Sequence, residues 1–238
     1  MNLEDHINII YENTYLNENI NFLDLWKKVF QKIYPNKKPN FNDPGWMKRI
    51  NKSFFLSKYF LSNIEMKGDV LECGVFKGFS SLLLIELEKL LNNHVINNYF
   101  LVDSFEGLSE ILEEDKPKNK DVFRNQQGNL KANFEDVEKC FFEYQNVNIL
   151  KGWIPNIFNV LDENNKYKFI HIDVDLYQPT LDTLNFFYDK VVEGGIIITD
   201  DYETPLFPGN KKAWQKFLFS RKISYFALPS GQAVIIKK

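Results

Sequence analysis

From residue 69 onward, short apolar segments of strand length alternate with segments whose apolar residues recur at helical spacing. This alternation predicts a mostly parallel sheet with helices on both faces. The expected strands are 69–75, 98–104, 147–151, 169–175, 195–200, 224–228 and 232–236. The expected helices are 80–91, 133–143, 180–190 and 211–219. Because only a short turn separates the last two strands, they form an antiparallel hairpin, and the expected fold is a seven-stranded α/β sheet.

The residues before this sheet carry a purely helical pattern. Apolar side chains recur at helical spacing over 3–11, 22–33 and 46–64. Three prolines separate the second of these segments from the third. We therefore expect a helical extension over 1–64 followed by one α/β domain over 65–238, a size that suits a single large core.

Charge and composition exclude several classes of protein. The formal net charge of -3 gives no overall positive field for nucleic acid, so nucleic acid is a poor candidate as a ligand. No apolar run approaches the roughly 20 residues that span a bilayer, and acidic residues stand where a signal peptide carries basic ones. We expect a cytoplasmic protein without a membrane span. Cys73 and Cys140 lack the spacing of a metal site and are expected to be reduced thiols.

A glycine turn follows the first strand of the predicted sheet. The strand ends near Glu72, the turn holds Gly74 and Gly78, and Ser80 opens the next helix, so backbone amides face a ligand there. The spacing differs from GxGxxG and from GxxxxGK[ST], and a carboxylate at this point suits a cationic group rather than a pyrophosphate. Asp103 ends the next strand, where acids of such folds receive ribose hydroxyls. The glycines alone also fit an ordinary tight turn, whereas the pair of acids favours a nucleoside ligand.

Two further strands end in carboxylates. A period of two places His171, Asp173 and Asp175 on one face of the fourth strand, and the fifth strand leads to Asp200 and Asp201. Converging carboxylates are costly without a cation, and neither segment contains Lys or Arg, so we predict a divalent metal bound by Asp173, Asp200 and Asp201. Asp175 is expected to be a substrate contact or a supporting group, with a ligand role as the alternative, and His171 is expected to be a buried core histidine. The alternative for Asp200 and Asp201 is helix capping.

Six segments together resemble the macrocin O-methyltransferases, a family that methylates sugar hydroxyls on natural products and related glycans. They occur in the family's order and spacing, and the resemblance extends from Trp46 to the end of the chain. The segments are ECGVFKGFS (72–80), VDSFEGL (102–108), NFEDV (133–137), LKGWIPN (150–156), IDVDLYQPTLDTL (172–184) and GGIIITDDY (194–202). The resemblance implies a Rossmann-like class I methyltransferase fold.

The resemblance also implies roles for individual residues. S-adenosylmethionine would be the methyl donor, assisted by Mg²⁺ or a similar divalent cation, with Asp173 as general base. The cofactor would be contacted by Glu72, Gly74, Val75, Phe76, Gly78 and Ser80 around its methionine part, by Asp103 and Ser104 at the ribose, and by Gly152 and Trp153 near the adenine. The magnesium ligands would be Asp173, Asp200 and Asp201, and the acceptor contacts Asp175, Tyr177 and Tyr202. Phe76-Lys77 stands where the family commonly has a Trp-Arg pair.

The implied acceptor contains a sugar, as a glycan, a nucleotide-sugar or a glycosylated natural product. The extension and the long charged segment 109–131 are expected to shape its pocket, the segment being either a lid or disordered. The N-terminal helices are alternatively expected to form a homodimer contact. Other functions that fit the pattern are a catechol-type small-molecule O-methyltransferase and a non-catalytic binding protein. A nicotinamide-dependent oxidoreductase is disfavoured by the missing GxGxxG spacing.

Overall fold

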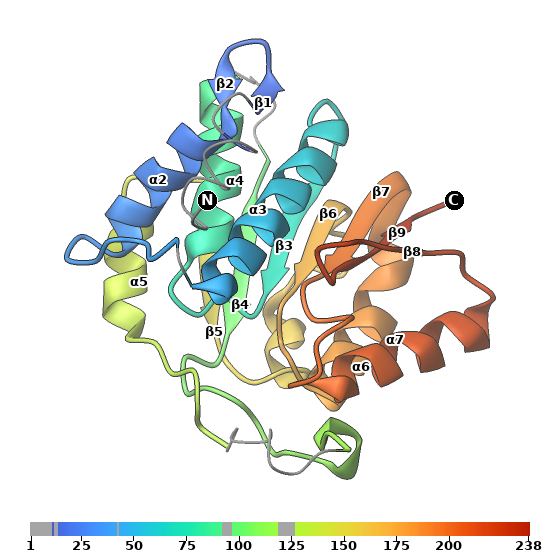
Figure 1. The fold of residues 1–238 in the computed structure, drawn as a ribbon. Helices are drawn as coiled ribbons and strands as arrows, with labels where there is room; N and C mark the ends of the chain where they lie inside the picture. The colour runs from blue at the N-terminus through green and yellow to red at the C-terminus, as the bar shows by residue number, and fades with distance from the viewer. Residues whose placement is uncertain (1–10, 12–13, 42, 92–96, 119–126) are drawn as a thin grey trace.

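The computed structural model describes residues 11, 14–41, 43–91, 97–118 and 127–238, and its centre is a seven-stranded sheet (Figure 1). The strands are β3 (Asp69–Cys73), β4 (Tyr99–Asp103), β5 (Val147–Lys151), β6 (Tyr167–Ile172), β7 (Val191–Thr199), β8 (Phe226–Ala227) and β9 (Ala233–Ile236). Their spatial order is β5-β4-β3-β6-β7-β9-β8. The first five are parallel, and β9 pairs antiparallel with both β7 and β8. The predicted sheet with its antiparallel terminal hairpin is confirmed.

Two of the strands end more than one residue earlier than the sequence pattern predicts. The expected first strand turns after Cys73, because Gly74 adopts a φ of 89°. The expected fourth strand ends at Ile172, and Asp175 has a φ of 61°, which a strand does not allow. The prediction that Asp173 and Asp175 continue the face of the strand is therefore wrong. Both carboxylates lie in the loop beyond the sheet edge.

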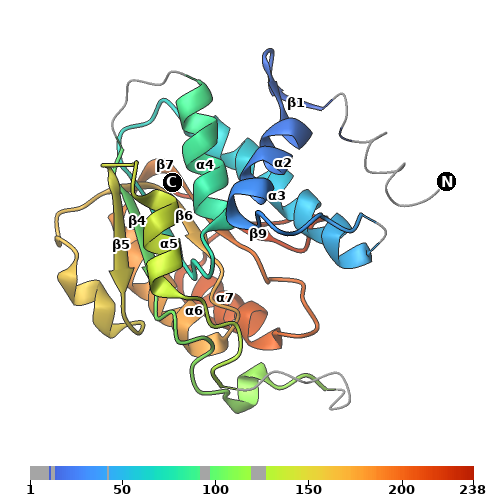
Figure 2. The same ribbon diagram turned by 90° about the vertical axis from the view of Figure 1, so that its left-hand side faces the viewer.

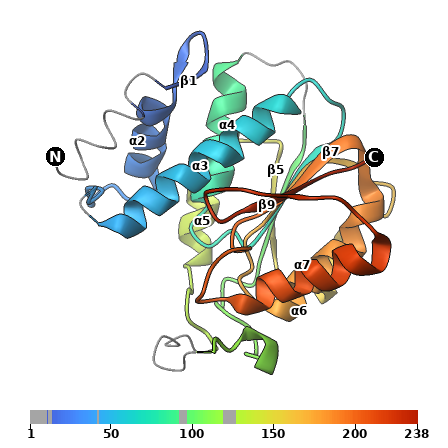
Figure 3. The ribbon, with the colours of Figure 1, turned by 45° about the vertical axis from the view of Figure 1, so that its right-hand side comes forward.

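The helices form two layers around the sheet (Figure 3). They are α2 (Phe22–Ile33), α3 (Pro44–Ser62), α4 (Phe79–Leu90), α5 (Phe134–Phe141), α6 (Tyr177–Phe187) and α7 (Pro208–Arg221). Alternate strand residues face opposite layers: Val70 and Phe169 belong to the core beneath α2 to α5, whereas Leu71 and Ile170 belong to the core beneath α6 and α7. Within the described ranges, none of these helices combines the length and apolar character needed to cross a membrane.

The N-terminal extension packs as part of the larger core. The helices predicted over 22–33 and 46–64 are present as α2 and α3, and they lie alongside α4 (Figure 2). A short hairpin of β1 (Tyr15–Asn17) and β2 (Ile20–Asn21), which the helical pattern did not predict, precedes α2. The helix predicted over 3–11 lies almost entirely outside the described residues.

Aromatic side chains connect the two N-terminal helices. Trp26 stacks on Phe30 with ring centroids 5.3 Å apart, and Tyr34 follows one turn later, 5.0 Å from Phe30. Trp46 of α3 packs edge-on against Phe30 at 5.2 Å. Trp26 is buried and Tyr34 is only partly covered, so this row of rings runs from the core to the surface.

The first part of the segment predicted to be a lid is tied to α6 and α7. Asp115 is fully buried, and its carboxylate accepts hydrogen bonds from the backbone N–H of Tyr177 at 2.7 Å and of Leu112 at 3.0 Å. Burial raises the pKa of Asp115, and the two backbone donors oppose that rise. A Cβ at Gly209 would lie 1.8 Å from Asp115 Oδ1, so the start of α7 accommodates the carboxylate only because residue 209 is glycine. Residues 119–126 of the predicted lid lie outside the described part.

Asp115→Ala is expected to detach this segment from the N-terminus of α6. Removing the carboxylate leaves two partly buried backbone N–H groups without this acceptor, at a cost of about 1 kcal/mol in the free energy of unfolding. Urea denaturation measures that loss, and hydrogen exchange at the Tyr177 amide localises it. Glu110→Ala, which removes an exposed carboxylate from the same segment, serves as the control. Equal exchange at Tyr177 in Asp115→Ala and in the unmodified protein would contradict the anchoring role.

Candidate active site

The carboxyl edge of the sheet opens into a cavity of about 650 Å³. One side of the cavity is formed by loops after β3, β4, β5, β6 and β7, and the other by α2 and α3. Most residues predicted to form the site line it: Glu72, Gly74, Val75, Phe76, Ser80, Asp103, Ser104, Gly152, Trp153, Asp173, Asp175, Asp200 and Asp201. The volume falls in the range of ligand-binding pockets in proteins, roughly 300–1,000 Å³.

Gly74 brings the first loop against the loop that carries Asp173. A Cβ at position 74 would lie 2.0 Å from the backbone oxygen of Asp173, so only glycine permits this approach. The N–H of Asp173 also donates to the carbonyl of Cys73 at 2.8 Å. The glycine turn and the acidic loop are therefore fixed to each other through their backbones.

Asp103 organises the backbone around this turn. Its two carboxylate oxygens accept hydrogen bonds from the N–H groups of Phe76 and Phe105, each at 2.7 Å. Both phenylalanines have a positive φ, of 50° and 58°, a conformation that is costly for residues with a side chain. The N–H of Gly152 donates to the backbone carbonyl of Asp103 at 2.9 Å, which draws the loop after β5 to the same place.

Glu72 is buried and already has partners for both carboxylate oxygens. Its Oε1 lies 2.8 Å from Nδ1 of His171, and its Oε2 accepts a hydrogen bond from Ser81 Oγ. Nε2 of His171 lies 3.6 Å from Asp200 Oδ1. Burial lowers the pKa of His171, but its contacts with Asp200 and Glu72 outweigh burial and raise the pKa to about 10. The histidine thus lies between two acids beneath the cavity, hydrogen-bonded to Glu72 and 3.6 Å from Asp200.

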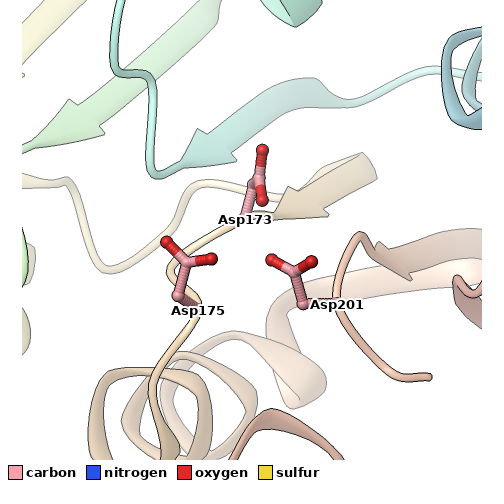
Figure 4. Close-up of side chains that lie close together, drawn as sticks. All are labelled: Asp173, Asp175 and Asp201. Carbon is pink, nitrogen blue, oxygen red and sulfur yellow. The ribbon is translucent and has the colours of Figure 1, made fainter. Parts of the chain in front are cut away.

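Three carboxylates converge at the wall of the cavity (Figure 4). Oxygen atoms of Asp173, Asp175 and Asp201 all lie within 4.8 Å of one another. Burial raises the pKa of Asp173 and of Asp175 well above the usual range, and the neighbouring carboxylates raise both further. Three hard oxygen donors with mutually unfavourable charges suit a divalent cation.

Asp200 is not a member of this group of three, and other side chains hold it. Its Oδ2 accepts a hydrogen bond from Lys52 Nζ at 2.7 Å, and its Oδ1 accepts one from Gln232 Nε2 at 2.8 Å. Lys52 also donates to Asp201 Oδ1 at 3.1 Å. Burial raises the pKa of Asp200, but the charges of Lys52 and His171 outweigh burial and hold that pKa below the usual range. Lys52, a residue of α3, therefore supplies the counter-charge that the two acidic segments lack in sequence.

Three predicted residues lie away from the cavity wall. Tyr202 is buried and donates through its hydroxyl to Tyr225 at 2.7 Å. Tyr177 contributes its backbone N–H to the Asp115 contact, and its ring lies 5.8 Å from Lys216 Nζ. Gly78 directly precedes α4 with a φ of 83°, and a Cβ at this position would lie 2.5 Å from the ring of Phe141.

Sequence reasoning also missed the α3 side of the cavity. Arg49 and Lys52 line the cavity with Trp46, and Lys77 lines it from the glycine turn. A signal was available, because three basic residues stand at 48, 49 and 52 in a chain that is acidic overall. α3 directly precedes β3, but its local pattern does not indicate that Lys52 meets Asp200, 148 positions away.

Known proteins with similar sequences are O-methyltransferases. The chain is 28% identical over 145 residues to demethyldecarbamoylnovobiocin O-methyltransferase of Streptomyces niveus, an alignment that covers 58% of this chain and only 54% of that protein. It is 25% identical over 211 residues to 8-demethyl-8-(2,3-dimethoxy-alpha-L-rhamnosyl)-tetracenomycin-C 4'-O-methyltransferase of Streptomyces olivaceus, covering 76% of this chain and 79% of that one.

A solved structure and a family model agree with these relatives. The structure of the O-methyltransferase NovP superimposes with a TM-score of 0.65 at 21% identity, covering 99% of this chain and 98% of NovP, which shows a shared fold. The sequence model described as Macrocin-O-methyltransferase (TylF) matches residues 58–226, more than half of the chain. The chain therefore belongs to the macrocin O-methyltransferase (TylF) family.

Proposed function

We propose that this protein transfers a methyl group from S-adenosylmethionine to a hydroxyl of a sugar-containing acceptor. The observation that carries the proposal is the backbone contact between Gly74 and Asp173, because it joins a nucleoside-type turn to the acidic group within one cavity. Family membership and the names of the relatives support the same reaction, one of them naming a rhamnosyl group.

The donor is proposed to lie along the loops after β3, β4 and β5. Gly74, Val75, Phe76 and Ser80 are candidates for the methionine part, Asp103 and Ser104 for the ribose, and Gly152 with Trp153 for the adenine. The half-exposed ring of Trp153 offers a face on which a base stacks. Glu72, with both oxygens engaged, is better suited to holding His171 and the turn in place than to binding the cofactor's ammonium group directly.

A divalent cation is proposed at the acidic group. The family resemblance implies Asp173, Asp200 and Asp201 as ligands, whereas the carboxylates that lie together are those of Asp173, Asp175 and Asp201. Asp173 and Asp201 are therefore ligands on both grounds. Lys52 pairs with both Asp200 and Asp201, so these two carboxylates would hold a cation once the ammonium has moved away from them. When bound, it would supply positive charge that lowers the pKa of an acceptor hydroxyl.

The chain's own residues then prepare the acceptor. In the proposed mechanism, a carboxylate oxygen of Asp173 accepts the proton of the attacking hydroxyl. Asp175 orients the acceptor from the same loop. The aromatic wall from α2 and α3 excludes water, which favours transfer from a charged sulfonium to an oxygen because the leaving thioether is neutral.

The proposal is tested by incubating the protein with S-adenosylmethionine labelled on the methyl group and a panel of acceptors. The panel contains nucleotide-linked sugars, lipid-linked sugars, glycosylated natural products and catechol, each with MgCl₂ or with EDTA. We expect label in a sugar-containing product, and its loss with EDTA. Label in catechol alone would contradict a sugar acceptor, and full activity in EDTA would contradict the metal.

A further inference from the structure

Three basic side chains lie where the aromatic row of α2 and α3 reaches the surface, two of them over the ring of Tyr34 and one over the ring of Trp46. The Nζ atoms of Lys77 and Lys37 lie 5.3 and 5.8 Å from the centre of the Tyr34 ring. Arg49 lies 4.9 Å from the ring of Trp46, and its charge opposes the rise that burial causes in the pKa of Tyr34. We refer to Tyr34, Lys37, Arg49 and Lys77 as the Tyr34 cluster.

The cations of the Tyr34 cluster lack negative partners. None of the three forms an ion pair with a carboxylate in the ranges that the structure describes, although the chain as a whole has a net charge of -3. Contacts with aromatic faces contribute only about 0.5–1 kcal/mol each at exposed sites, which does not explain why three like charges gather there. A bound anion would relieve their repulsion.

The Tyr34 cluster shares the cavity of the acidic group. Tyr34, Arg49 and Lys77 line that cavity, whereas Lys37 is not part of its lining and contacts the Tyr34 ring. Arg49 precedes Lys52 by three residues on α3, a rise of about 4.5 Å along the helix, and Lys52 contacts Asp200 and Asp201. The cavity thus has an acidic end and a cationic end. The α3 residues that reach them, Lys52 and Arg49, are about one helical turn apart. A ligand that satisfies both ends carries hydroxyls on one part and a negative charge on the adjoining part.

We propose that the Tyr34 cluster binds the phosphate of the acceptor, and that the acceptor is a sugar joined to a phosphate or pyrophosphate rather than a neutral glycoside. The inference rests on the proposed methyl transfer and names the acceptor class more narrowly. The guanidinium of Arg49 offers paired donors to phosphate oxygens, and Lys77 adds a compact positive charge from the glycine turn. A nucleotide-linked and a lipid-linked sugar present the same chemistry here.

The first experiment measures binding without catalysis. Isothermal titration with sodium pyrophosphate and, separately, with S-adenosylhomocysteine compares the unmodified protein with Arg49→Gln/Lys77→Gln in metal-free buffer. Lys27→Gln/Lys67→Gln is the control, because it removes the same charge from exposed lysines that do not line the cavity. Circular dichroism confirms that each variant is folded.

We expect the cluster variant to bind pyrophosphate about tenfold more weakly or worse, with little change in its affinity for S-adenosylhomocysteine. An equal loss in the control variant would overturn the inference, because the effect would then come from overall charge. A parallel loss of S-adenosylhomocysteine affinity would also overturn it, because the cluster would then hold the methionine carboxylate.

The second experiment measures acceptor preference. Nucleoside diphosphate sugars, polyprenyl diphosphate sugars and methyl glycosides of the same sugars are compared by kcat/KM. We expect a preference for a phosphorylated form, and Arg49→Gln/Lys77→Gln should reduce that preference about tenfold, mainly through KM. Equal use of methyl glycosides would overturn the inference and leave methyl transfer intact, whereas no transfer together with no S-adenosylhomocysteine binding would overturn the proposed function itself.

Discussion

Replacing Asp173 by Asn is expected to reduce methyl transfer by about 10²–10⁴-fold, the usual contribution of a general base. The amide keeps the shape of the carboxylate but neither accepts the hydroxyl proton nor offers an anionic oxygen to a cation. Initial rates with labelled S-adenosylmethionine measure the loss, and isothermal titration with S-adenosylhomocysteine should show that cofactor binding survives. Asp136→Asn, which changes an exposed carboxylate on α5, is the control.

The same substitution is expected to raise the melting temperature of the metal-free protein at neutral pH. Burial and neighbouring acids raise the pKa of Asp173 in the folded state, so its contribution to stability is present below the unfolded pKa and is lost as pH rises through the folded pKa. Asn carries no such penalty. Full transfer activity, or a melting temperature lower than that of the unmodified protein in EDTA, would contradict the role given to Asp173.

Gly74→Ala is expected to be the most damaging single substitution in the donor site. The positive φ costs an alanine about 1–3 kcal/mol, and its Cβ would also collide with the backbone oxygen of Asp173 at 2.0 Å. Because neither atom is on a flexible side chain, the two loops must separate. We expect a loss of at least about 3 kcal/mol in the free energy of unfolding together with weak cofactor binding.

Gly231→Ala separates the two causes. Gly231 has a φ of 90°, nearly that of Gly74, but the nearest atom to its added Cβ lies 3.7 Å away. This control therefore carries the backbone cost without the collision. Urea denaturation and titration with S-adenosylhomocysteine compare the two variants, and equal effects on both measurements would show that the contact with Asp173 has no special importance.

The sequence predicted those parts of the fold that depend on local periodicity. Alternating apolar positions located the strands, and the glycine turn, Asp103 at the end of β4 and the acids after β6 and β7 lie at one edge of the sheet, as predicted. The end of β6 was predicted wrongly because Asp175 continues the alternation in sequence while its positive φ takes it out of the strand. Periodicity reports which residues alternate but contains no information on where a chain turns.

The sequence could not predict which side chains far apart along the chain contact one another in the site. Lys52 and Asp200 are 148 positions apart, so no local pattern connects them. Lys52 pairs with both Asp200 and Asp201, so one side chain of α3 holds the two acids after β7 beside the loop of Asp173 and Asp175. Gly209 is a second example, because no local pattern shows that a side chain at this position would collide with Asp115.

The spacing of side chains on α3 has a consequence for selectivity. Arg49 and Lys52 are held on one rigid helix whose inner face belongs to the core, so the separation between the two ends of the acceptor site is fixed by helical rise. An acceptor then binds productively when the distance from its phosphate to its reacting hydroxyl matches the spacing of Arg49 and Lys52 along α3. Related chains would then change acceptor length by moving a basic residue one turn along this helix, while the sheet and its donor loops stay the same.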